Sequence, residues 1–407
     1  MIPLIINRNC FFDGSPGGEC LRAFLGAIQE AEWKPIVYAS DRKPRVEPVP
    51  SYARLSRERV YIRYLAAAIR RILVPDLTYL PDYAWYSWGK NVVKRIVIDL
   101  KTGVIRPDYI HSVAYPIGSH WAALQVKRAT GLPWVMQFYD PWADSPFRTF
   151  KTEWLKKKDW EMEREAVEAA DLIIHDNDII ADIWRERYGS IIAQKMKVLP
   201  LTVPLPKSEA MPARKTCADK VVMAHIGNFS DVRRAEPFIM AVMHLLKLHP
   251  ELSGRLLVHF IGEVYEKDIE LINNNGLDNI IVLHGTLSAS ECEPFYNSAD
   301  VFLSEEGFDA SNKLFFPSKI LKYFYYQRPI LGISPKGTVL ETELSKAGHK
   351  VFIDSDIDGI SGYIYRAITD YRSLFTFNKD YWRTFEPENV VSQYKAYIEE
   401  FIMNTQK

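Results

Sequence analysis

The chain has 407 residues and a mass of 47.0 kDa, which exceeds the roughly 250–300 residues that one hydrophobic core normally supports. Its 51 Lys and Arg residues balance its 51 Asp and Glu residues, and 47% of the chain is hydrophobic. This composition excludes an intrinsically disordered chain and a generally basic nucleic-acid binder. We therefore expect two folded domains and no nucleic-acid partner.

The sequence gives no sign of a membrane-spanning helix, which would need an apolar run of ~18 residues. The opening apolar run at 2–6 is too short for the core of a signal peptide, so we expect a cytoplasmic protein. Neither a disulfide framework nor a thiolate metal site is predicted, because the cysteines form no C-x-x-C pair and lie far from any histidine cluster. These cysteines are Cys10, Cys20, Cys217 and Cys292.

Short apolar runs alternate with longer stretches of helical period, a pattern typical of parallel strands buried on both faces by crossover helices. A first series comprises 3–7, 35–40, 108–114, 134–139, 171–175 and 197–201. A second series comprises 221–227, 255–262, 279–285, 300–305, 329–334 and 350–355. A tract rich in proline and lysine at 204–218 separates the two series and is the predicted linker.

The two series predict an α/β protein with two Rossmann-like, doubly wound domains at 1–203 and 219–385, facing an interdomain cleft. The last helical stretch, about 386–407, follows the second series and is expected to pack back onto the N-terminal domain. Sheets of this kind bind ligands at the carboxyl ends of their strands, so polar and glycine residues at these ends are candidate site residues.

The first candidate site follows the first predicted strand. Gly14, Gly17 and Gly18 stand just before a helix predicted to begin near Leu21. Glycine allows backbone N–H groups to approach a ligand, and a helix N-terminus favours anions, so a phosphate is one interpretation. A plain strand-to-helix turn is the alternative.

In the second domain, Gly227 and Asn228 close the first strand, and Arg233 and Arg234 precede a helix that Pro237 is expected to start. An arginine here could hold a diphosphate leaving group through charge-assisted hydrogen bonds, and the alternative is a solvated arginine pair.

The P-S-K sequence at 317–319 suits a helix start after another strand. Pro317 would take the first helical position, leaving the N–H groups of Ser318 and Lys319 free beside the lysine charge. We interpret it as a second anion-binding element, and a routine helix start is the alternative.

Asp140 follows the strand at 134–139 and could accept a hydroxyl hydrogen bond or a proton, or simply form an Asx-Pro turn. His120 follows the strand at 108–114, where a catalytic histidine and a packing histidine are both open. The D-x-D patterns at 176–178 and 354–356 are interpreted as helix caps, and 288–291 as a capping box.

A basic segment at 51–71 contains one glutamate and six arginines in a helical period, interleaved with Tyr and Leu. Such a surface suits anionic lipid headgroups, with a solvated helix as the alternative. Its arginines are Arg54, Arg57, Arg59, Arg63, Arg70 and Arg71. The W-Y-S-W run at 85–88 is expected to fill a core rather than stack on sugar rings.

Taken together, these segments resemble the GT-B glycosyltransferases, specifically those of family 4, over nearly the whole chain. The resemblance rests on the S-P-G-G loop at 15–18, on the segments at 132–142 and 163–177, on HIGNFSDVRRAEPF at 225–238, and on 299–306 followed by PSKILKYFYYQRPIL at 317–331. Any one of these matches is weak, but their order and spacing together are specific.

The resemblance implies roles for several residues. Gly17 and Gly18 correspond to a loop near the donor diphosphate, and Arg233, with Arg234 as an alternative, and Lys319 correspond to the cations that hold it. It also implies a nucleotide-sugar donor, a glycan or lipid-linked acceptor, retention of anomeric configuration, no metal or other cofactor, and peripheral contact with the inner membrane face.

One position departs from the family pattern. Many relatives carry E-x(7)-E, whose second glutamate binds the nucleotide ribose, whereas this chain has Leu314 and Lys322 at the two positions. A lysine cannot accept the ribose hydroxyl protons as a carboxylate does. Either Glu305, Glu306 or Asp309 takes that role, or the donor is held in an unusual way, or the protein is not a transferase.

The expected activity is transfer of a sugar from a nucleotide-sugar to a hydroxyl acceptor in cell-surface polysaccharide or glycolipid assembly. The departure at Lys322 leaves two alternatives open. One is a catalytically inactive binding subunit of a polysaccharide-assembly complex, and the other is a sugar-nucleotide 2-epimerase on the same fold.

Overall fold

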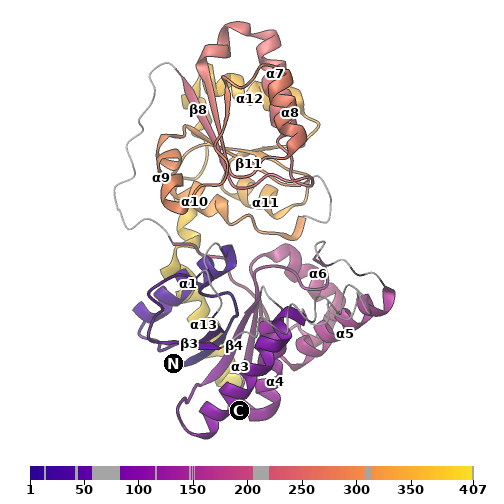
Figure 1. Cartoon of the computed structure of the whole chain (residues 1–407), viewed down its shortest axis with the longest axis vertical. Coiled ribbons are helices and arrows are strands. Elements are labelled where there is room, and N and C mark those ends of the chain that lie inside the picture. The colour runs from indigo at the N-terminus through magenta and orange to yellow at the C-terminus, as the bar shows by residue number, and fades with distance from the viewer. Residues whose placement is uncertain are drawn as a thin grey trace. The chain divides into compact units, whose positions relative to one another are not determined.

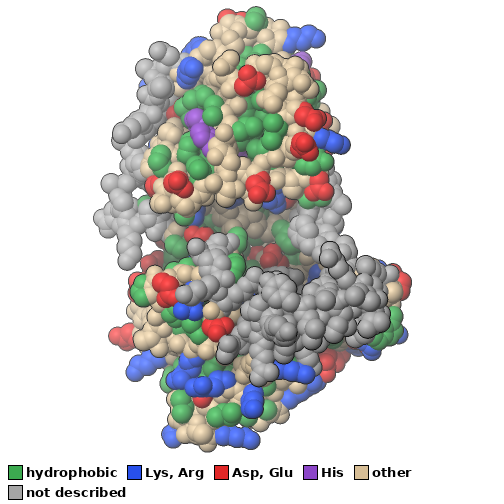
Figure 2. All heavy atoms as spheres, viewed as in Figure 1, with side chains coloured by type: hydrophobic (Ala, Val, Ile, Leu, Met, Phe, Trp, Pro, Cys, Tyr) green, Lys and Arg blue, Asp and Glu red, His purple; other side chains and the backbone are tan. Residues whose placement is uncertain are grey.

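A computed structural model describes residues 1–12, 15–41, 45–56, 83–114, 117–145, 148, 150, 152–204, 220–307 and 313–405. Within it, the chain divides into two compact units (Figure 1). The first unit comprises Met1–Pro204 with Thr384–Lys407, and the second comprises Leu205–Arg383. On the face shown in Figure 2, acidic and basic side chains are interspersed over the second unit, in keeping with a formal net charge of zero.

The first unit is built on a parallel sheet whose described strands run in the order β3-β2-β1-β4-β5-β6-β7. The strands are β1 (Pro3–Ile6), β2 (Ile36–Ser40), β3 (Ala53–Ser56), β4 (Tyr109–Ala114), β5 (Trp134–Phe138), β6 (Leu172–His175) and β7 (Met196–Val198). The helices described in this unit are α1 (Pro16–Glu30), α3 (Tyr83–Lys101), α4 (Gly118–Thr130), α5 (Glu153–Ala169), α6 (Asp178–Tyr188) and α13 (Pro387–Thr405).

The C-terminal helix α13 belongs to the first unit and packs against α1. The hydroxyl of Tyr394, fully buried on α13, lies 2.9 Å from Nδ1 of His111 and 2.8 Å from the hydroxyl of Tyr109, both on β4. Hydrogen bonds between buried polar groups fix the orientation of the helix that carries them. The helix is therefore anchored beside the strand on which these two residues lie.

The second unit has a parallel sheet with the strand order β10-β9-β8-β11-β12-β13. The strands are β8 (Val221–Ile226), β9 (Leu256–Ile261), β10 (Ile281–Leu283), β11 (Val301–Glu305), β12 (Ile330–Ile333) and β13 (Lys350–Phe352). The helices described are α7 (Glu236–Leu248), α8 (Glu266–Asn274), α9 (Ala289–Ser298), α10 (Lys319–Tyr325), α11 (Val339–Lys346) and α12 (Ile357–Thr369). Helices α7 and α12 pack against each other (Figure 1).

Each sheet has a point where the strand order reverses. In the first unit β1 lies between β2 and β4, and in the second unit β8 lies between β9 and β11. The carboxyl ends of the strands at such a point form the ligand-binding edge of doubly wound sheets. The predicted fold class, two Rossmann-like parallel-sheet domains, is confirmed.

Three details differ from the sequence-based expectations. The helical interpretation of 51–71 is wrong at its start, because 53–56 pair with β2 as the edge strand β3, which carries Arg54. Helix α1 begins at Pro16 rather than near Leu21, since the Ser15 side chain caps it by accepting from the Gly18 N–H. Helix α10 begins at Lys319, two residues after Pro317.

The discounted motifs are helix caps, as expected. Asn177 caps α6 and Asp356 caps α12 through side-chain oxygens, and Ser288 with Glu291 forms a capping box on α9. Trp88, the described side chain of the W-Y-S-W run, is fully buried. No helix in the described part of the chain is long and apolar enough to cross a membrane.

Candidate functional site

Glycines follow three adjacent strands at the carboxyl edge of the second sheet. Gly227 follows β8, Gly262 follows β9 and Gly285 lies two residues after β10, with φ values of +143°, +125° and +66°. A Cβ on Gly262 would lie 2.4 Å from the carbonyl oxygen of Gly227 and 2.8 Å from Oδ1 of Asn228. Only glycine fits there without a shift of backbone. The sequence-based interpretation missed Gly262, because its constraint comes from the neighbouring strand.

Lys319 lies directly beside this edge. Its Nζ is 3.2 Å from Nε2 of His225 on β8, and a Cβ on Gly227 would lie 3.8 Å from the same ammonium group. Burial and the neighbouring Arg233 charge lower the pKa of Lys319 to about 7, while Glu306 and Glu305 oppose this shift. Burial also lowers the pKa of His225 well below its usual value, so the neutral imidazole accepts a hydrogen bond from the lysine. His225, also missed by the sequence-based interpretation, holds Lys319 against the sheet.

Arg233 is the second cation of the site. Its guanidinium group lies 2.6 Å from Oε1 of Glu306, whose side chain is buried, and Arg233 keeps 33% of its side chain exposed. The Gly307 N–H donates to the same carboxylate oxygen. Glu306 therefore holds Arg233 in place while part of the guanidinium group remains available to a ligand.

Glu305 is the last residue of β11 and is fully buried. Neither of its carboxyl oxygens has a hydrogen-bond partner among the described residues. Burial raises its pKa well above the usual value, although the nearby Lys319 opposes this shift. An unpaired carboxyl group beside a lysine of lowered pKa is characteristic of a functional site rather than of a hydrophobic core.

The other predicted donor-site residues have structural partners or lie at the rim. Arg234 pairs with Asp268 of α8 and with Glu236 of α7, so it joins these two helices. Asn228 accepts a hydrogen bond from the Glu263 N–H through its side-chain oxygen. Ser318 precedes α10 without capping it through its side chain. Of the two adjacent arginines, Arg233 is the one beside Glu306 and Lys319.

In the first unit, Gly17 and Gly18 lie in the first turn of α1, and Gly14 lies outside the described residues. A Cβ on Gly18 would lie 2.6 Å from the carbonyl oxygen of Asn9, so the chain's own backbone requires this glycine. A Cβ on Gly17 would lie 3.6 Å from the Tyr139 ring and meet nothing nearer. Gly17 therefore lies at the same edge of the first sheet as the residues that follow β5.

Asp140 is partly exposed at this edge, and desolvation raises its pKa to about 6. His120 differs, because it is fully buried. Its Nδ1 is 2.8 Å from the Ser112 hydroxyl, and its ring lies 4.4 Å from the Phe138 ring. These contacts favour the packing alternative for His120, whereas Asp140, which is partly exposed, stays a candidate site residue.

The segment that carries Asp140 is held by buried Asp159 of α5. Asp159 accepts hydrogen bonds from Nε1 of Trp142 at 3.1 Å and from Nε of Arg148 at 3.0 Å. We expect Asp159→Ala to destabilise the first unit by about 3–5 kcal/mol, because the buried Arg148 guanidinium and the Trp142 indole lose the carboxylate to which they donate. Urea unfolding followed by tryptophan fluorescence measures this, since nine of the ten tryptophans belong to the first unit.

The matched control is Asp182→Ala, which removes a carboxylate that is 71% exposed and pairs with Arg185 on the same helix. Its expected effect is within about 0.5 kcal/mol. Equal effects of the two substitutions would contradict the role assigned to Asp159.

The predicted acceptor and membrane face, Arg57, Arg59, Arg63, Arg70 and Arg71, lies outside the described residues, as does Asp309. No group of three or more His, Cys, Asp or Glu side chains placed to hold a metal ion occurs in the parts of the chain that the structure describes.

Comparisons with known proteins agree with this arrangement. Residues 20–205 match the model of Glycosyltransferase Family 4. The whole chain superimposes on sucrose-phosphate synthase from Thermosynechococcus elongatus with a TM-score of 0.68 and 14% identity, covering 99% of each chain. The chain therefore has the GT-B fold, and residues 20–205 of its N-terminal unit resemble family 4 glycosyltransferases.

Two other GT-B structures match the chain over its full length. HepE of Anabaena, solved in complex with UDP-glucose, gives a TM-score of 0.63 at 12% identity and covers 99% of this chain and 100% of its own. The α,α-trehalose 6-phosphate synthase of Burkholderia multivorans gives 0.64 at 13% identity and covers 100% and 97%. No match was found among curated protein sequences.

Leu314 and Lys322, the two positions at which the sequence departs from the expected E-x(7)-E pattern, both lie in the second unit. Lys322 lies on α10, one turn after Lys319, and its charge acts on the Cys292 thiol of α9. The carboxyl groups described beside Lys319 are those of Glu305 and Glu306, which come from β11 and the residue after it.

Proposed function

We propose that this protein is a retaining, metal-independent glycosyltransferase that transfers a sugar from a nucleoside diphosphate-sugar to a hydroxyl acceptor. The observation that carries the proposal is the pair of cations, Arg233 and Lys319, beside Gly227 at the switch point of the second sheet. The UDP-glucose complex of HepE, which has the same fold, supports a nucleoside diphosphate-sugar as the donor.

In the proposed reaction, the bond between the anomeric carbon and the donor phosphate breaks, and negative charge builds up on the departing diphosphate. Lys319 and Arg233 neutralise that charge through charge-assisted hydrogen bonds. The glycines that follow β8, β9 and β10, namely Gly227, Gly262 and Gly285, allow the diphosphate to approach the backbone closely. His225 and Glu306 keep the two cations in position before the donor arrives.

The nucleotide ribose would be recognised differently from the common family pattern. Glu305 has two unpartnered carboxyl oxygens among the described residues and lies near Lys319, so we propose it as the replacement for the missing glutamate at 322. Glu306 is less suited, because one of its oxygens already holds Arg233.

On the acceptor side, we propose that Asp140 orients the acceptor hydroxyl or accepts its proton, with Gly17 at the same edge of the first sheet. Its pKa of about 6 suits a group that takes up a proton near neutral pH. A glycan or lipid-linked acceptor in cell-surface polysaccharide or glycolipid assembly, met at the inner membrane face through the basic segment at 57–71, completes the proposal.

A transfer assay separates this proposal from its alternatives. Release of nucleoside diphosphate from a panel of UDP-, GDP- and TDP-sugars, measured with and without glycan acceptors, should depend on acceptor. Turnover of the sugar-nucleotide without any acceptor would indicate a 2-epimerase instead. Donor binding or acceptor binding without any turnover would indicate an inactive binding subunit, the alternative that Lys322 favours.

The lowered pKa of Lys319 predicts an unusual pH dependence. Because the cation is the active form, kcat/KM for the donor should fall as pH rises through about 7, where free-enzyme Lys319 loses its proton. The bound diphosphate favours the charged form, so kcat should fall only at higher pH. The matched variant is Lys319→Arg, whose guanidinium stays protonated and should remove the alkaline limb of the kcat/KM profile. A limb unchanged in Lys319→Arg would assign the titration to another group.

A further inference from the structure

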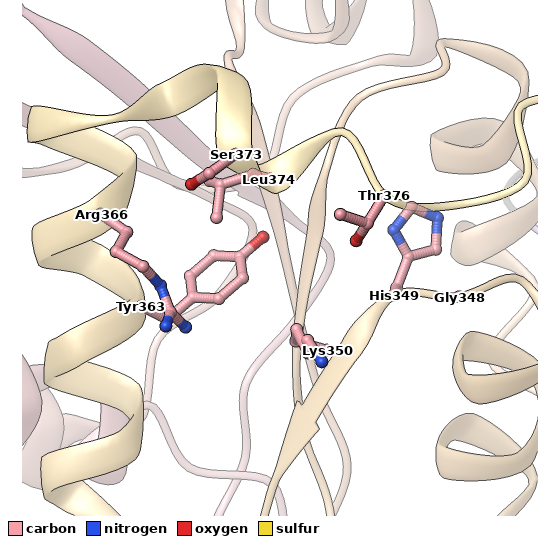
Figure 3. Close-up of a pocket in the computed structure, with 8 residues that line it drawn as sticks. All are labelled: Gly348, His349, Lys350, Tyr363, Arg366, Ser373, Leu374 and Thr376. Atoms are coloured by element: carbon pink, nitrogen blue, oxygen red, sulfur yellow. The ribbon is translucent and has the colours of Figure 1, made fainter.

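The second unit contains a cavity at the edge of the sheet opposite the donor site. It lies among the start of β13, helix α12 and the segment at 371–376, and has a volume of about 320 Å³ (Figure 3). Its lining residues are Gly348, His349, Lys350, Tyr363, Arg366, Ser373, Leu374 and Thr376. Because Lys350 begins β13 whereas Glu305 ends β11 in the same parallel sheet, the cavity and the donor site belong to opposite edges.

The lining of this cavity is positively charged. Lys350 and Arg366 contribute cations, and no lining residue carries a carboxylate. Both residues are solvent-exposed, and neither side chain forms an ion pair or a hydrogen bond with any residue that the structure describes. Two unpaired cations facing one cavity attract an anion and repel a cationic ligand.

Tyr363 contributes a hydroxyl group to the cavity. Its side chain is 2% exposed and its ring packs near Phe352 at the edge of the core. Figure 3 shows the hydroxyl pointing from α12 toward the side of the cavity formed by Thr376 and His349. This hydroxyl has no hydrogen-bond partner among the described residues. The hydroxyl opens onto the cavity, so it is able to donate a hydrogen bond to a ligand there.

The opposite wall of the cavity is held in a fixed position. His349 Nδ1 accepts from the Ile330 N–H, and burial lowers its pKa to about 3, so the ring is neutral and carries its proton on Nε2. Gly348 has φ of +82°, and a Cβ there would lie 3.1 Å from the Cα of Phe377. The Asn378 N–H bonds to the carbonyl of Ala347 and fastens the segment carrying Thr376 to this wall.

We propose that this cavity binds a small molecule through its phosphate group. A phosphate accepts several hydrogen bonds at once, which matches two cations and the hydroxyl groups of Tyr363 and Thr376 better than a neutral sugar would. The volume is at the small end of ligand pockets, roughly 300–1,000 Å³, so the ligand is of the size of a sugar phosphate or smaller. The proposal does not depend on the transferase activity.

Isothermal titration calorimetry with inorganic phosphate, glucose 6-phosphate and glucose tests the proposal. The titrations use the full chain carrying Arg233→Gln and Lys319→Gln, so that the donor-site cations do not contribute. A phosphate-bearing probe should bind with one-to-one stoichiometry. Arg366→Gln should weaken it about tenfold, and Tyr363→Phe severalfold, with the ring retained in the core.

The matched control is Arg372→Gln, which removes the same charge from an exposed residue that does not line the cavity. Its effect should be less than about twofold, because general charge is largely screened by salt. Tighter binding of glucose 6-phosphate would identify a phosphorylated sugar as the ligand, and equal binding of phosphate would identify the free ion. Absence of binding at millimolar concentrations, equal binding of glucose, or equal losses in the Arg366 and Arg372 variants would overturn the proposal.

Discussion

Replacement of Lys319 by alanine is expected to lower kcat/KM for the nucleotide-sugar by about 10²–10³-fold, the loss typical of removing one charge-stabilising group from a transition state. The physical reason is the position of its ammonium group, which is partly buried between His225 and the Arg233 charge beside Gly227. Activity is measured as release of nucleoside diphosphate from the donor that the panel identifies.

The control for this variant is Lys247→Ala, an exposed lysine near the end of α7. It should leave kcat/KM unchanged. Because burial disfavours the charged form of Lys319, replacing this side chain by alanine should not destabilise the fold. Urea unfolding of the Lys319→Ala variant measures this. Full activity in folded Lys319→Ala would exclude Lys319 from the reaction.

Gly262→Ala is expected to destabilise the β8–β9 region by about 2–4 kcal/mol and to disrupt donor binding. The added methyl group would lie 2.4 Å from the carbonyl oxygen and 2.6 Å from the carbonyl carbon of Gly227, which are backbone atoms that must move. Gly227 borders the Lys319 ammonium group, so the shift reaches the site. Hydrogen exchange of the amides in β8 and β9 measures the local loss of stability.

Alanine substitutions at two other glycines, Gly276 and Gly254, distinguish the effect of steric overlap from the effect of backbone strain. Gly276 has a φ of +62° but open space around its Cβ position. Gly254 also has open space there, and its φ lies outside the left-handed region. Alanine should cost about 1 kcal/mol at Gly276 and less than about 0.5 kcal/mol at Gly254. If Gly262→Ala cost no more than Gly276→Ala, the close contact with Gly227 would not be the cause.

The sequence predicted the fold well because the fold depends on patterns that repeat along the chain. Apolar runs bounded by helical stretches located the buried strands, for example β4 and β8, within one residue of their ends. Side-chain caps such as Asn177 and Ser288 depend only on residues three positions away, so they were also predicted correctly. The strand β3 was missed because four residues at a sheet edge leave too short a pattern within a basic segment.

The site was predictable only in part, because its decisive contacts join residues far apart in the sequence. Nothing local distinguishes Arg233 from Arg234, yet one meets Glu306, 73 residues away, and the other meets Asp268, 34 residues away. Likewise, Gly262 appears as an ordinary strand end until β8 is placed beside it. For His120 the sequence suggested a role that the structure does not favour. Its position after a strand made it a candidate site residue, but its complete burial favours a packing role.

The central claim is that Arg233 and Lys319 hold the diphosphate of a nucleotide-sugar. Calorimetric titration of UDP-, GDP-, TDP- and CMP-sugars into the wild-type protein and into the Arg233→Gln, Lys319→Gln double variant tests it most directly. At least one nucleoside diphosphate-sugar should bind the wild type, and the double variant should bind the same sugar at least about 100-fold more weakly. CMP-sugars, which have a single phosphate, should bind the wild type poorly. Wild-type affinity in the double variant, or no binding of any nucleotide-sugar, would contradict the claim.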